Sequence, residues 1–205
     1  MSDKIPKGLY GIVFPISTEN FVDSAKMMID KGAGIIQYRD KLIDDSSFLH
    51  NAEKIKQVCE DSNALFIVND RARIAEELDT NVHLGSKDNS PILLRRSGFN
   101  NIIGYTIDNY DSFNNSIKEG ILSLSDYLGT GPVFFTTMKP DKKPIGLEEV
   151  GKIIRESLLP AYVIGGIKEK NIENILSLEP AGVAIMSYNF CNNNIINKIN
   201  KHYRR

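Results

Sequence analysis

The chain has 205 residues, 41% of them hydrophobic, which suffices for one sizeable core and predicts a single domain over residues 1–205. Its 25 basic and 26 acidic residues give a net charge of -1, which argues against a nucleic-acid-binding surface. No apolar run has the length of a membrane span, and the first residues lack the apolar stretch of a signal peptide. We expect a cytoplasmic protein whose partners are small molecules, not nucleic acid or a membrane; the sequence leaves open whether it forms a homo-oligomer.

Short apolar runs alternate with segments of helical periodicity along the whole chain. The apolar runs predict strands at 8–14, 35–38, 65–68, 81–84, 101–106, 126–129, 161–164 and 182–186. The periodic segments predict helices at 20–31, 46–59, 72–78, 92–96, 111–119, 147–158, 171–178 and 193–202. Eight strand–helix units with short connections predict an α/β fold, a single (β/α)8 TIM barrel, more than a doubly wound sheet.

Polar side chains follow the second predicted strand at alternate positions. Gln37, Arg39 and Lys41 would point the same way in extended backbone. A guanidinium can hold phosphate oxygens by two hydrogen bonds, an ammonium adds a compact charge, and an amide can bond the edge of a heterocycle. The pattern fits an anion-binding site and, equally, a solvated charged loop that includes Asp40 and Asp44.

Two carboxylates follow neighbouring predicted strands. Asp70 comes after the third strand and Asp88 after the fourth, so both lie at the face where the carboxyl ends of the strands meet. Two carboxylates at one rim suit Mg²⁺, which keeps further positions for substrate phosphate oxygens. The alternative is that each aspartate caps the helix that follows it, and without the pairing this alternative would be preferred.

The loops after the last three predicted strands have the features of a phosphate site. Gly165 and Gly166 follow the seventh strand and would let the backbone approach an anion, although they could also form only a tight turn. Ser187 adds a hydroxyl after the eighth strand. In the loop after the sixth strand, Thr136 and Lys139 could bridge two anionic groups.

Hydrolysis through an acyl-enzyme is disfavoured, because the sequence shows no Ser/His/Asp set and no candidate covalent nucleophile. His83 is interpreted as a residue of the fourth strand packed near the barrel rim rather than as a base. His50 and His202 fall on predicted helices, where we expect them at the surface.

Taken in chain order, these motifs resemble the thiamine-phosphate synthase family. The matching stretches are QYRDK (37–41), VNDR (68–71), VHLGSKD (82–88), GTGPVFFTTMKP (129–140), GLEEV (146–150), VIGGIKEKN (163–171) and GVAIMS (182–187). The resemblance covers nearly the whole chain and implies a (β/α)8 barrel. It also implies a Mg²⁺-dependent transferase that couples a pyrimidine methyl diphosphate to a thiazole phosphate, releasing pyrophosphate by a dissociative mechanism.

The resemblance further implies roles for single side chains. Those implied to hold the pyrimidine diphosphate are Gln37, Arg39, Lys41, Asn69 and Lys139. Arg39, Lys41 and Lys139 would also act in catalysis, and Asp70 and Asp88 would bind Mg²⁺. Those implied to seat the thiazole phosphate are Thr136, Gly166, Met186 by its main chain, and Ser187.

Four places depart from the family pattern. Thr106, which the resemblance also implies to bind substrate, stands where the family usually has Ser. Met138 stands where the family commonly has Thr, Asp108 where a His often follows the fifth strand, and the first strand ends in FPIS (14–17) rather than the usual Thr-Asp. A thiazole tautomerase, the sister barrel, would want a His near position 108 and would not need the diphosphate-handling residues. An isomerase or epimerase would need an acid/base pair at the rim. A non-catalytic paralogue that binds a thiamine precursor is a further alternative, which Met138 keeps open.

Overall fold

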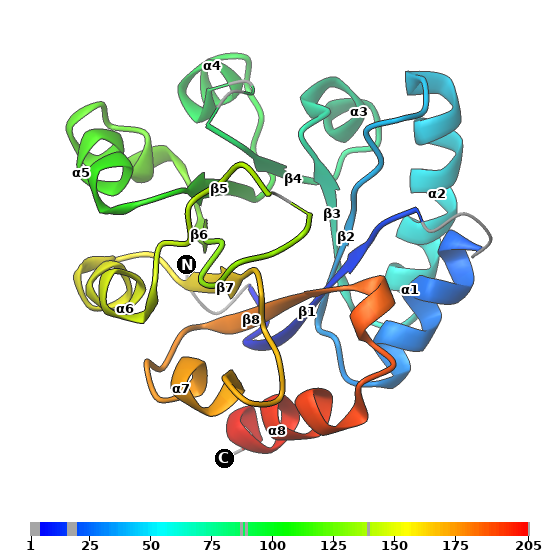
Figure 1. The fold of residues 1–205 in the computed structure, drawn as a ribbon. Coiled ribbons are helices and arrows are strands. Elements are labelled where there is room, and N and C mark those ends of the chain that lie inside the picture. Colours follow the sequence, from blue (N-terminus) through cyan, green and yellow to red (C-terminus); the bar gives the residue numbers. More distant parts are fainter. Residues whose placement is uncertain (1–4, 16–19, 87, 89, 139, 205) are drawn as a thin grey trace.

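Eight parallel strands form a closed barrel in the computed structural model, which describes residues 5–15, 20–86, 88, 90–138 and 140–204. The strands are β1 (Gly8–Val13), β2 (Ile35–Tyr38), β3 (Leu65–Asn69), β4 (Asn81–Leu84), β5 (Ile103–Ile107), β6 (Tyr127–Thr130), β7 (Ala161–Ile164) and β8 (Gly182–Met186). Each strand pairs with the next in sequence, and β8 pairs with β1 to close the barrel. Figure 1 looks along this barrel.

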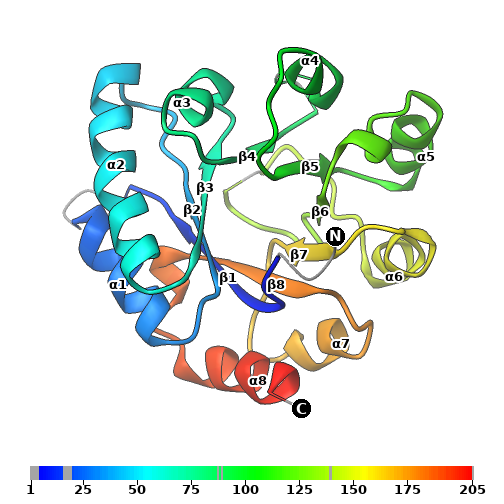
Figure 2. The ribbon, with the colours of Figure 1, turned by 180° about the vertical axis from the view of Figure 1, so that it is seen from behind.

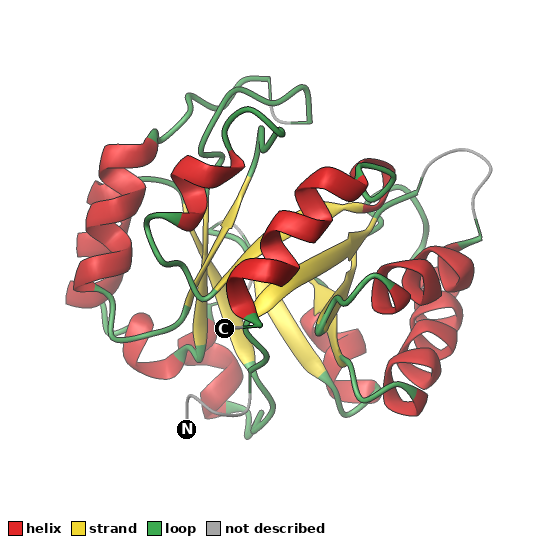
Figure 3. Cartoon of the chain, turned by 90° about the horizontal axis from the view of Figure 1, so that it is seen from below, coloured by secondary structure: helices red, strands yellow, loops and turns green. Residues whose placement is uncertain are grey.

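A helix follows every strand and lies on the outside of the barrel. The helices are α1 (Phe21–Asp30), α2 (Asp45–Asp61), α3 (Ala72–Glu77), α4 (Pro91–Arg96), α5 (Tyr110–Lys118), α6 (Leu147–Glu156), α7 (Ile172–Leu176) and α8 (Asn193–Tyr203). Two short 3₁₀ turns, η2 (Leu122–Leu124) and η3 (Ser187–Asn189), complete the described elements. Figure 3 shows the strands inside the shell of helices, and the predicted TIM barrel is confirmed.

The clearest boundary difference lies before β5. The apolar pattern predicts a strand from residue 101, but the strand begins at Ile103. The guanidinium of Arg95 donates to the carbonyl of Asn101 at 2.8 Å, and the Asn81 side chain accepts from the amide of Ile102 at 3.0 Å. These side-chain bonds occupy the carbonyl of Asn101 and the amide of Ile102, and an apolar pattern cannot reveal them.

Two apolar cores follow from the alternation of side chains along each strand. One fills the barrel interior and includes three tyrosines, Tyr10, Tyr127 and Tyr162. The other fills the layer between the barrel and the helices. Residues 5–7 cross the N-terminal end of the barrel, where the carbonyl of Pro6 accepts a 2.7 Å hydrogen bond from the Tyr162 hydroxyl (Figure 2). Ile5 of this segment is buried and belongs to the interior core.

None of the helices in the described part of the chain combines the length and apolarity that crossing a bilayer requires.

Candidate active site

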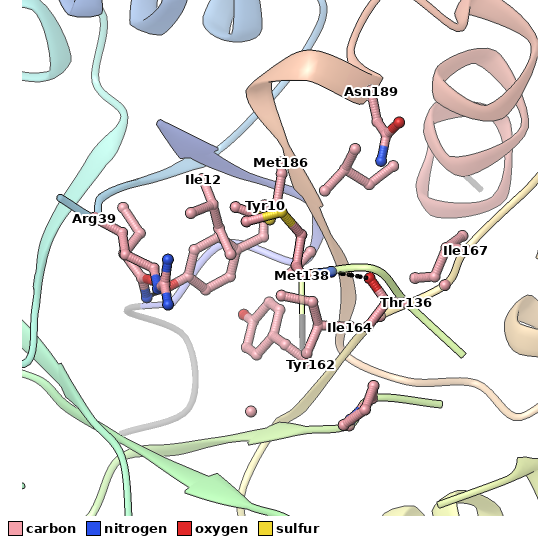
Figure 4. A pocket seen from close by; sticks show the side chains of 18 of the residues that line it. Tyr10, Ile12, Arg39, Thr136, Met138, Tyr162, Ile164, Ile167, Met186 and Asn189 are labelled. Carbon is pink, nitrogen blue, oxygen red and sulfur yellow. Dashed lines mark hydrogen bonds between the residues drawn. The ribbon is translucent and has the colours of Figure 1, made fainter. Parts of the chain in front are cut away.

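A cavity of about 370 Å³ opens at the carboxyl ends of the strands, the face where (β/α)8 barrels carry their active sites. Arg39 lies on one side of this cavity, while Thr136, Ile167 and Asn189 lie on the other (Figure 4). The predicted site residues that line it are Gln37, Arg39, Asn69, Thr106, Thr136, Gly166 and Met186. Those with described positions outside its lining are Lys41, Asp70, Asp88 and Ser187. Lys139 lies outside the described residues.

Gln37 and Arg39 enter the cavity from β2 and from the loop that follows it. Gln37 is buried, and its Nε2 donates to the Tyr10 hydroxyl at 2.7 Å. The guanidinium of Arg39 lies 5.3 Å from the centre of the Phe14 ring. Burial lowers the pKa of Arg39, and the nearby charges of Asp70 and Asp40 act against this effect. A partly desolvated cation of this kind suits a polyanionic ligand.

Lys41 and Asp70 form an ion pair beside the cavity. The Lys41 Nζ lies 2.7 Å from Asp70 Oδ2, and the Asp70 side chain is the more buried partner. Burial alone would raise the pKa of Asp70, but the hydrogen bond and charge of Lys41 outweigh it, so the pKa is lowered. Asp70 has φ of 64°, a left-handed conformation that turns the chain sharply after β3. Asp70 does not cap α3, whose N-cap residue is Arg71.

Asp88 extends the acidic part of the site from the loop after β4. Its Oδ2 accepts a 2.8 Å hydrogen bond from the amide of Gly85. Burial together with the hydrogen bond and charge of Asp70 raises the pKa of Asp88, because two carboxylates in contact resist ionising together. Asp88 does not cap α4 either, since Ser90 accepts from the amide of Ile92 in that role. The capping alternative is therefore wrong for both aspartates.

The donor set at Asp70 and Asp88 fits a magnesium ion. Carboxylate oxygens are the ligands Mg²⁺ prefers, and it commonly takes only one or two of them plus water and substrate phosphate oxygens. The charge of Asp70 is one of the causes that raise the pKa of Asp88, so the two carboxylates lie near enough to interact. Within the described residues there is no cluster of three or more His, Cys, Asp or Glu.

The loop after β2 is only partly the solvated charged segment that the sequence allowed. Asp40 is buried at 3% exposure, and its Oδ1 accepts from the amide of Leu42 at 2.9 Å. Asp44 is exposed and caps α2 by accepting from the amide of Ser47. Lys41 is half exposed and paired with Asp70. The predicted solvated loop is thus right for Asp44 and wrong for Asp40.

Glycines let the loops after β6 and β7 meet at the cavity. The amide of Val133 donates to the carbonyl of Ile164 at 3.0 Å. A Cβ at Gly131 would lie 2.1 Å from that carbonyl oxygen, and a Cβ at Gly166 would lie 2.6 Å from the Phe135 carbonyl oxygen. Gly165 and Gly166 both have positive φ, 101° and 67°. The glycine pair is therefore required by close approach as well as by its turn.

Ser187 holds the first turn after β8 rather than facing the cavity. It is buried, and its hydroxyl donates to the carbonyl of Phe14 at 3.2 Å. Its neighbour Met186 lines the cavity, as do Tyr188 and Asn189 in η3. In the loop after β6, Thr136 Oγ1 accepts a hydrogen bond from the amide of Met138 at 3.3 Å (Figure 4). Both hydroxyls are near the predicted phosphate site but bonded to the main chain.

A hydrogen-bonded chain across the barrel floor is the main feature that sequence reasoning missed. Tyr10 and Tyr127 join their hydroxyls at 2.9 Å, and Tyr127 also lies 2.9 Å from His83 Nδ1. His83 Nε2 lies 2.9 Å from Thr106 Oγ1. Through the Gln37–Tyr10 bond, five side chains from five strands are connected. His83 therefore faces the interior, and alternation along β1 and β6 could have placed both tyrosines there.

We expect Tyr127→Phe to lower the free energy of unfolding by about 1 to 3 kcal/mol, because it leaves the buried Tyr10 and the partly buried His83 each with one hydrogen bond fewer. Chemical denaturation of the variant and the parent measures this difference. The matched control is Tyr110→Phe, whose hydroxyl bonds the exposed Glu156. That change should cost less than about 0.5 kcal/mol. Equal effects of the two substitutions would show that the interior chain adds nothing.

Asp108, which follows β5 and departs from the family pattern, connects the loops after β4 and β6. It forms an ion pair with Lys142 of the loop after β6 and accepts a 3.2 Å hydrogen bond from the Ser86 hydroxyl. Its backbone amide donates a 3.1 Å hydrogen bond to Ser112 Oγ in α5. The aspartate thus has a defined structural partner at the position where the sister barrels would want a histidine.

Comparisons with known proteins agree with this geometry. A family model described as thiamine monophosphate synthase matches residues 9–188. The thiamine-phosphate synthase of Caldivirga maquilingensis is 34% identical over 90% of this chain and 89% of its own length. That of Nostoc punctiforme is 36% identical over 87% of this chain but 50% of its own length, so this chain spans half of that relative.

A solved structure gives the same result. The thiamine phosphate pyrophosphorylase from Pyrococcus furiosus superposes with a TM-score of 0.80 and 28% identity, over 99% of this chain and 95% of the other. Fold, motif order and family model agree over nearly the whole chain. The chain belongs to the thiamine monophosphate synthase family.

Proposed function

We propose that this protein is a thiamine-phosphate synthase that joins hydroxymethylpyrimidine diphosphate to thiazole phosphate with Mg²⁺. The observation that carries the proposal is one cavity with two unlike ends. Arg39, beside the Lys41–Asp70–Asp88 group, forms a charged end. The glycine loop at Gly166 forms the other end. Such a cavity suits a diphosphate at one end and a phosphorylated ring at the other.

The protein's part in this reaction is to hold the leaving diphosphate and its growing negative charge. Mg²⁺, when bound at Asp70 and Asp88, would supply charge stabilisation for that leaving group. Arg39 would donate hydrogen bonds to its oxygens, and Lys41 would add a second positive charge next to Asp70. Lys139 is proposed to contact the same group. The family's mechanism passes through a pyrimidine methyl cation, which the thiazole nitrogen then attacks.

The floor of the cavity would hold the pyrimidine ring. Gln37 uses its amide nitrogen for Tyr10, so its amide oxygen is available to accept a hydrogen bond from the ring. Asn69 and Thr106 line the same space. His83 has its two ring nitrogens next to the hydroxyls of Tyr127 and Thr106, which suits a structural role better than that of a strong base. A dissociative reaction needs no such base from the protein.

The phosphate of the thiazole would bind where the loops after β6, β7 and β8 meet. Gly166 and Met186 would supply main-chain amides to it, because the amides of such loops bind phosphate in many barrels. Thr136 would add a hydroxyl. Ser187 would join them if its weak hydrogen bond to Phe14 were exchanged for the phosphate.

The test is a coupling assay on the purified protein with both substrates. Thiamine phosphate and pyrophosphate should appear together in equal amounts, and removing Mg²⁺ with a chelator should stop both. Loss of the diphosphate substrate without thiamine phosphate would contradict the proposal. Tight binding of thiazole phosphate without turnover would favour the non-catalytic paralogue, and isomerisation of a thiazole phosphate alone would favour the sister tautomerase.

We expect Ser187→Ala to raise the KM for thiazole phosphate by about tenfold, the worth of one charge-assisted hydrogen bond. The KM for the pyrimidine diphosphate should change less than about twofold. Steady-state kinetics with each substrate varied in turn measures both values. Because Ser187 also bonds Phe14, the melting temperature is measured alongside. Equal changes in both KM values would argue against placing the thiazole phosphate here.

A further inference from the structure

Arg71 is the one polar residue of the VNDR stretch (68–71) to which the proposed mechanism gives no role. Its side chain is one-fifth exposed and points to the loop between β2 and α2, residues 39–44, here named the Lys41 loop. Its Nη2 donates to the carbonyl of Asp40 at 3.2 Å and to that of Ile43 at 2.6 Å. Its Nη1 pairs with Asp45, the first residue of α2. One guanidinium therefore holds both ends of the loop.

The ring of Phe48 supports the guanidinium from the helix side. The Arg71 Cζ lies 4.6 Å from the centre of this ring, within cation–π range. Phe48 is fully buried and stacks on Tyr38, the last residue of β2, at 4.4 Å between ring centres. The support is thus part of the core, so Arg71 has a fixed orientation rather than a mobile surface position.

The contacts of Arg71 leave Lys41 and Leu42 as the tip of the loop. Lys41 lies between the two carbonyls that Arg71 bonds and makes its own ion pair with Asp70. Within the described part of the chain, this tip is otherwise held by the hydrogen bond from the amide of Leu42 to Asp40 and by the Lys41–Asp70 ion pair. Leu42 is 88% exposed, so apolar burial does not hold the tip in place.

The turn at Asp70 explains how neighbouring residues reach opposite sides of the loop. Asp70 has a left-handed backbone, and the amide of Arg71 donates to the carbonyl of Asn69 at 2.8 Å. After this tight turn, Asp70 meets the tip at Lys41 while Arg71 meets the base of the loop. The two residues that follow β3 therefore hold the Lys41 loop together.

We propose that Arg71 is a positioning residue that fixes the Lys41 loop, so that the Lys41 ammonium stands at Asp70 before substrate arrives. The part that concerns catalysis rests on the proposed function. A planar fork with several donors can bond two carbonyls and a carboxylate together, whereas the single ammonium of lysine cannot keep that geometry. Arg71→Lys therefore keeps the charge and removes the positioning.

The first test reads the order of the loop without substrate. Hydrogen–deuterium exchange of the peptide covering residues 39–45 should be about tenfold faster in Arg71→Lys than in the parent, because the opening free energy of the loop falls. The matched control is Arg73→Lys, an exposed arginine on α3. Asp45→Asn removes one partner and leaves both carbonyl bonds, so its effect should be intermediate. Unchanged exchange in Arg71→Lys would overturn the proposal.

The second test asks whether Arg71 acts through Lys41. In Arg71→Lys, kcat/KM for the pyrimidine diphosphate should fall about 30-fold, since small misplacements of a catalytic group are costly. The KM for thiazole phosphate should stay within about twofold of the parent value. In a Lys41→Ala background the same change should cost less than about threefold, because coupled residues are not additive. Fully multiplicative losses would overturn the proposal.

These readouts separate the two proposals. If the parent protein forms no thiamine phosphate, the proposed function fails, while exchange of the Lys41 loop still decides whether Arg71 holds it. If coupling is normal and Arg71→Lys behaves like Arg73→Lys in both tests, the role of Arg71 fails and the proposed function stands. Circular dichroism of each variant checks that the barrel is intact.

Discussion

Asp70→Asn and Asp88→Asn are each expected to lower kcat by at least about 100-fold, because each removes a negative charge from the site proposed for the metal at the leaving group. Asparagine keeps the shape of the side chain and tolerates the left-handed backbone at position 70. The barrel should therefore stay folded, and the loss should appear in the rate rather than in the melting temperature.

The same prediction can be tested by measuring metal affinity as well as rate. Mn²⁺ can replace Mg²⁺ as a spectroscopic probe. With pyrophosphate present, titration should show that both variants bind Mn²⁺ more weakly than the parent protein does. The matched control is Glu77→Gln, an exposed carboxylate on α3, which should leave rate and metal binding unchanged. A variant with the parent's rate at low Mg²⁺ would refute the metal assignment for that aspartate.

Gly131→Ala is expected to cost more than about 3 kcal/mol of folding free energy and to abolish activity. The new Cβ would lie 2.1 Å from the carbonyl oxygen of Ile164, at a residue whose φ is 153°. Because that carbonyl accepts from Val133, the loop after β6 cannot move away without losing its bond to β7. Thermal and chemical denaturation measure the loss.

Gly98→Ala is the control that separates the two contributions to the cost of Gly131→Ala, steric contact of the new Cβ and strain of the backbone. Gly98 also has positive φ, 95°, but a Cβ there would meet nothing within 4 Å. Its substitution should therefore cost only the strain of a left-handed alanine, about 1 to 2 kcal/mol. If both glycine substitutions cost the same, the contact between the β6 loop and the end of β7 is not what makes Gly131 necessary.

The positions of the site residues show how much can be predicted from which polar residues follow each strand in the sequence. This pattern placed Gln37, Arg39 and Asn69 correctly at the cavity, because parallel strands deliver the residues at their carboxyl ends to one face. It also brought Asp70 and Asp88 together as neighbours. It could not tell a capping aspartate from a paired one, because both follow a strand and precede a helix.

Other features depend on contacts between segments that sequence spacing does not connect. Arg71 reads as the start of α3, yet its guanidinium bonds residues 40, 43 and 45 of another unit. Asp40 reads as a solvated charge, yet it is buried inside its own loop. Lys142 is followed by another lysine in the loop after β6, and nothing in that local pattern marks it as the partner of Asp108. A local pattern carries no signal for any of these partners.

The sequence by itself determined the eight strand–helix units and the face on which polar residues gather, because periodicity and strand ends are local properties of the chain. Only the tertiary structure decided that Tyr10, Tyr127, His83 and Thr106 meet across the floor, and that Arg71 holds the Lys41 loop. Barrel closure sets the first of these meetings, because pairing β8 with β1 fixes which inward side chains of distant strands share a level.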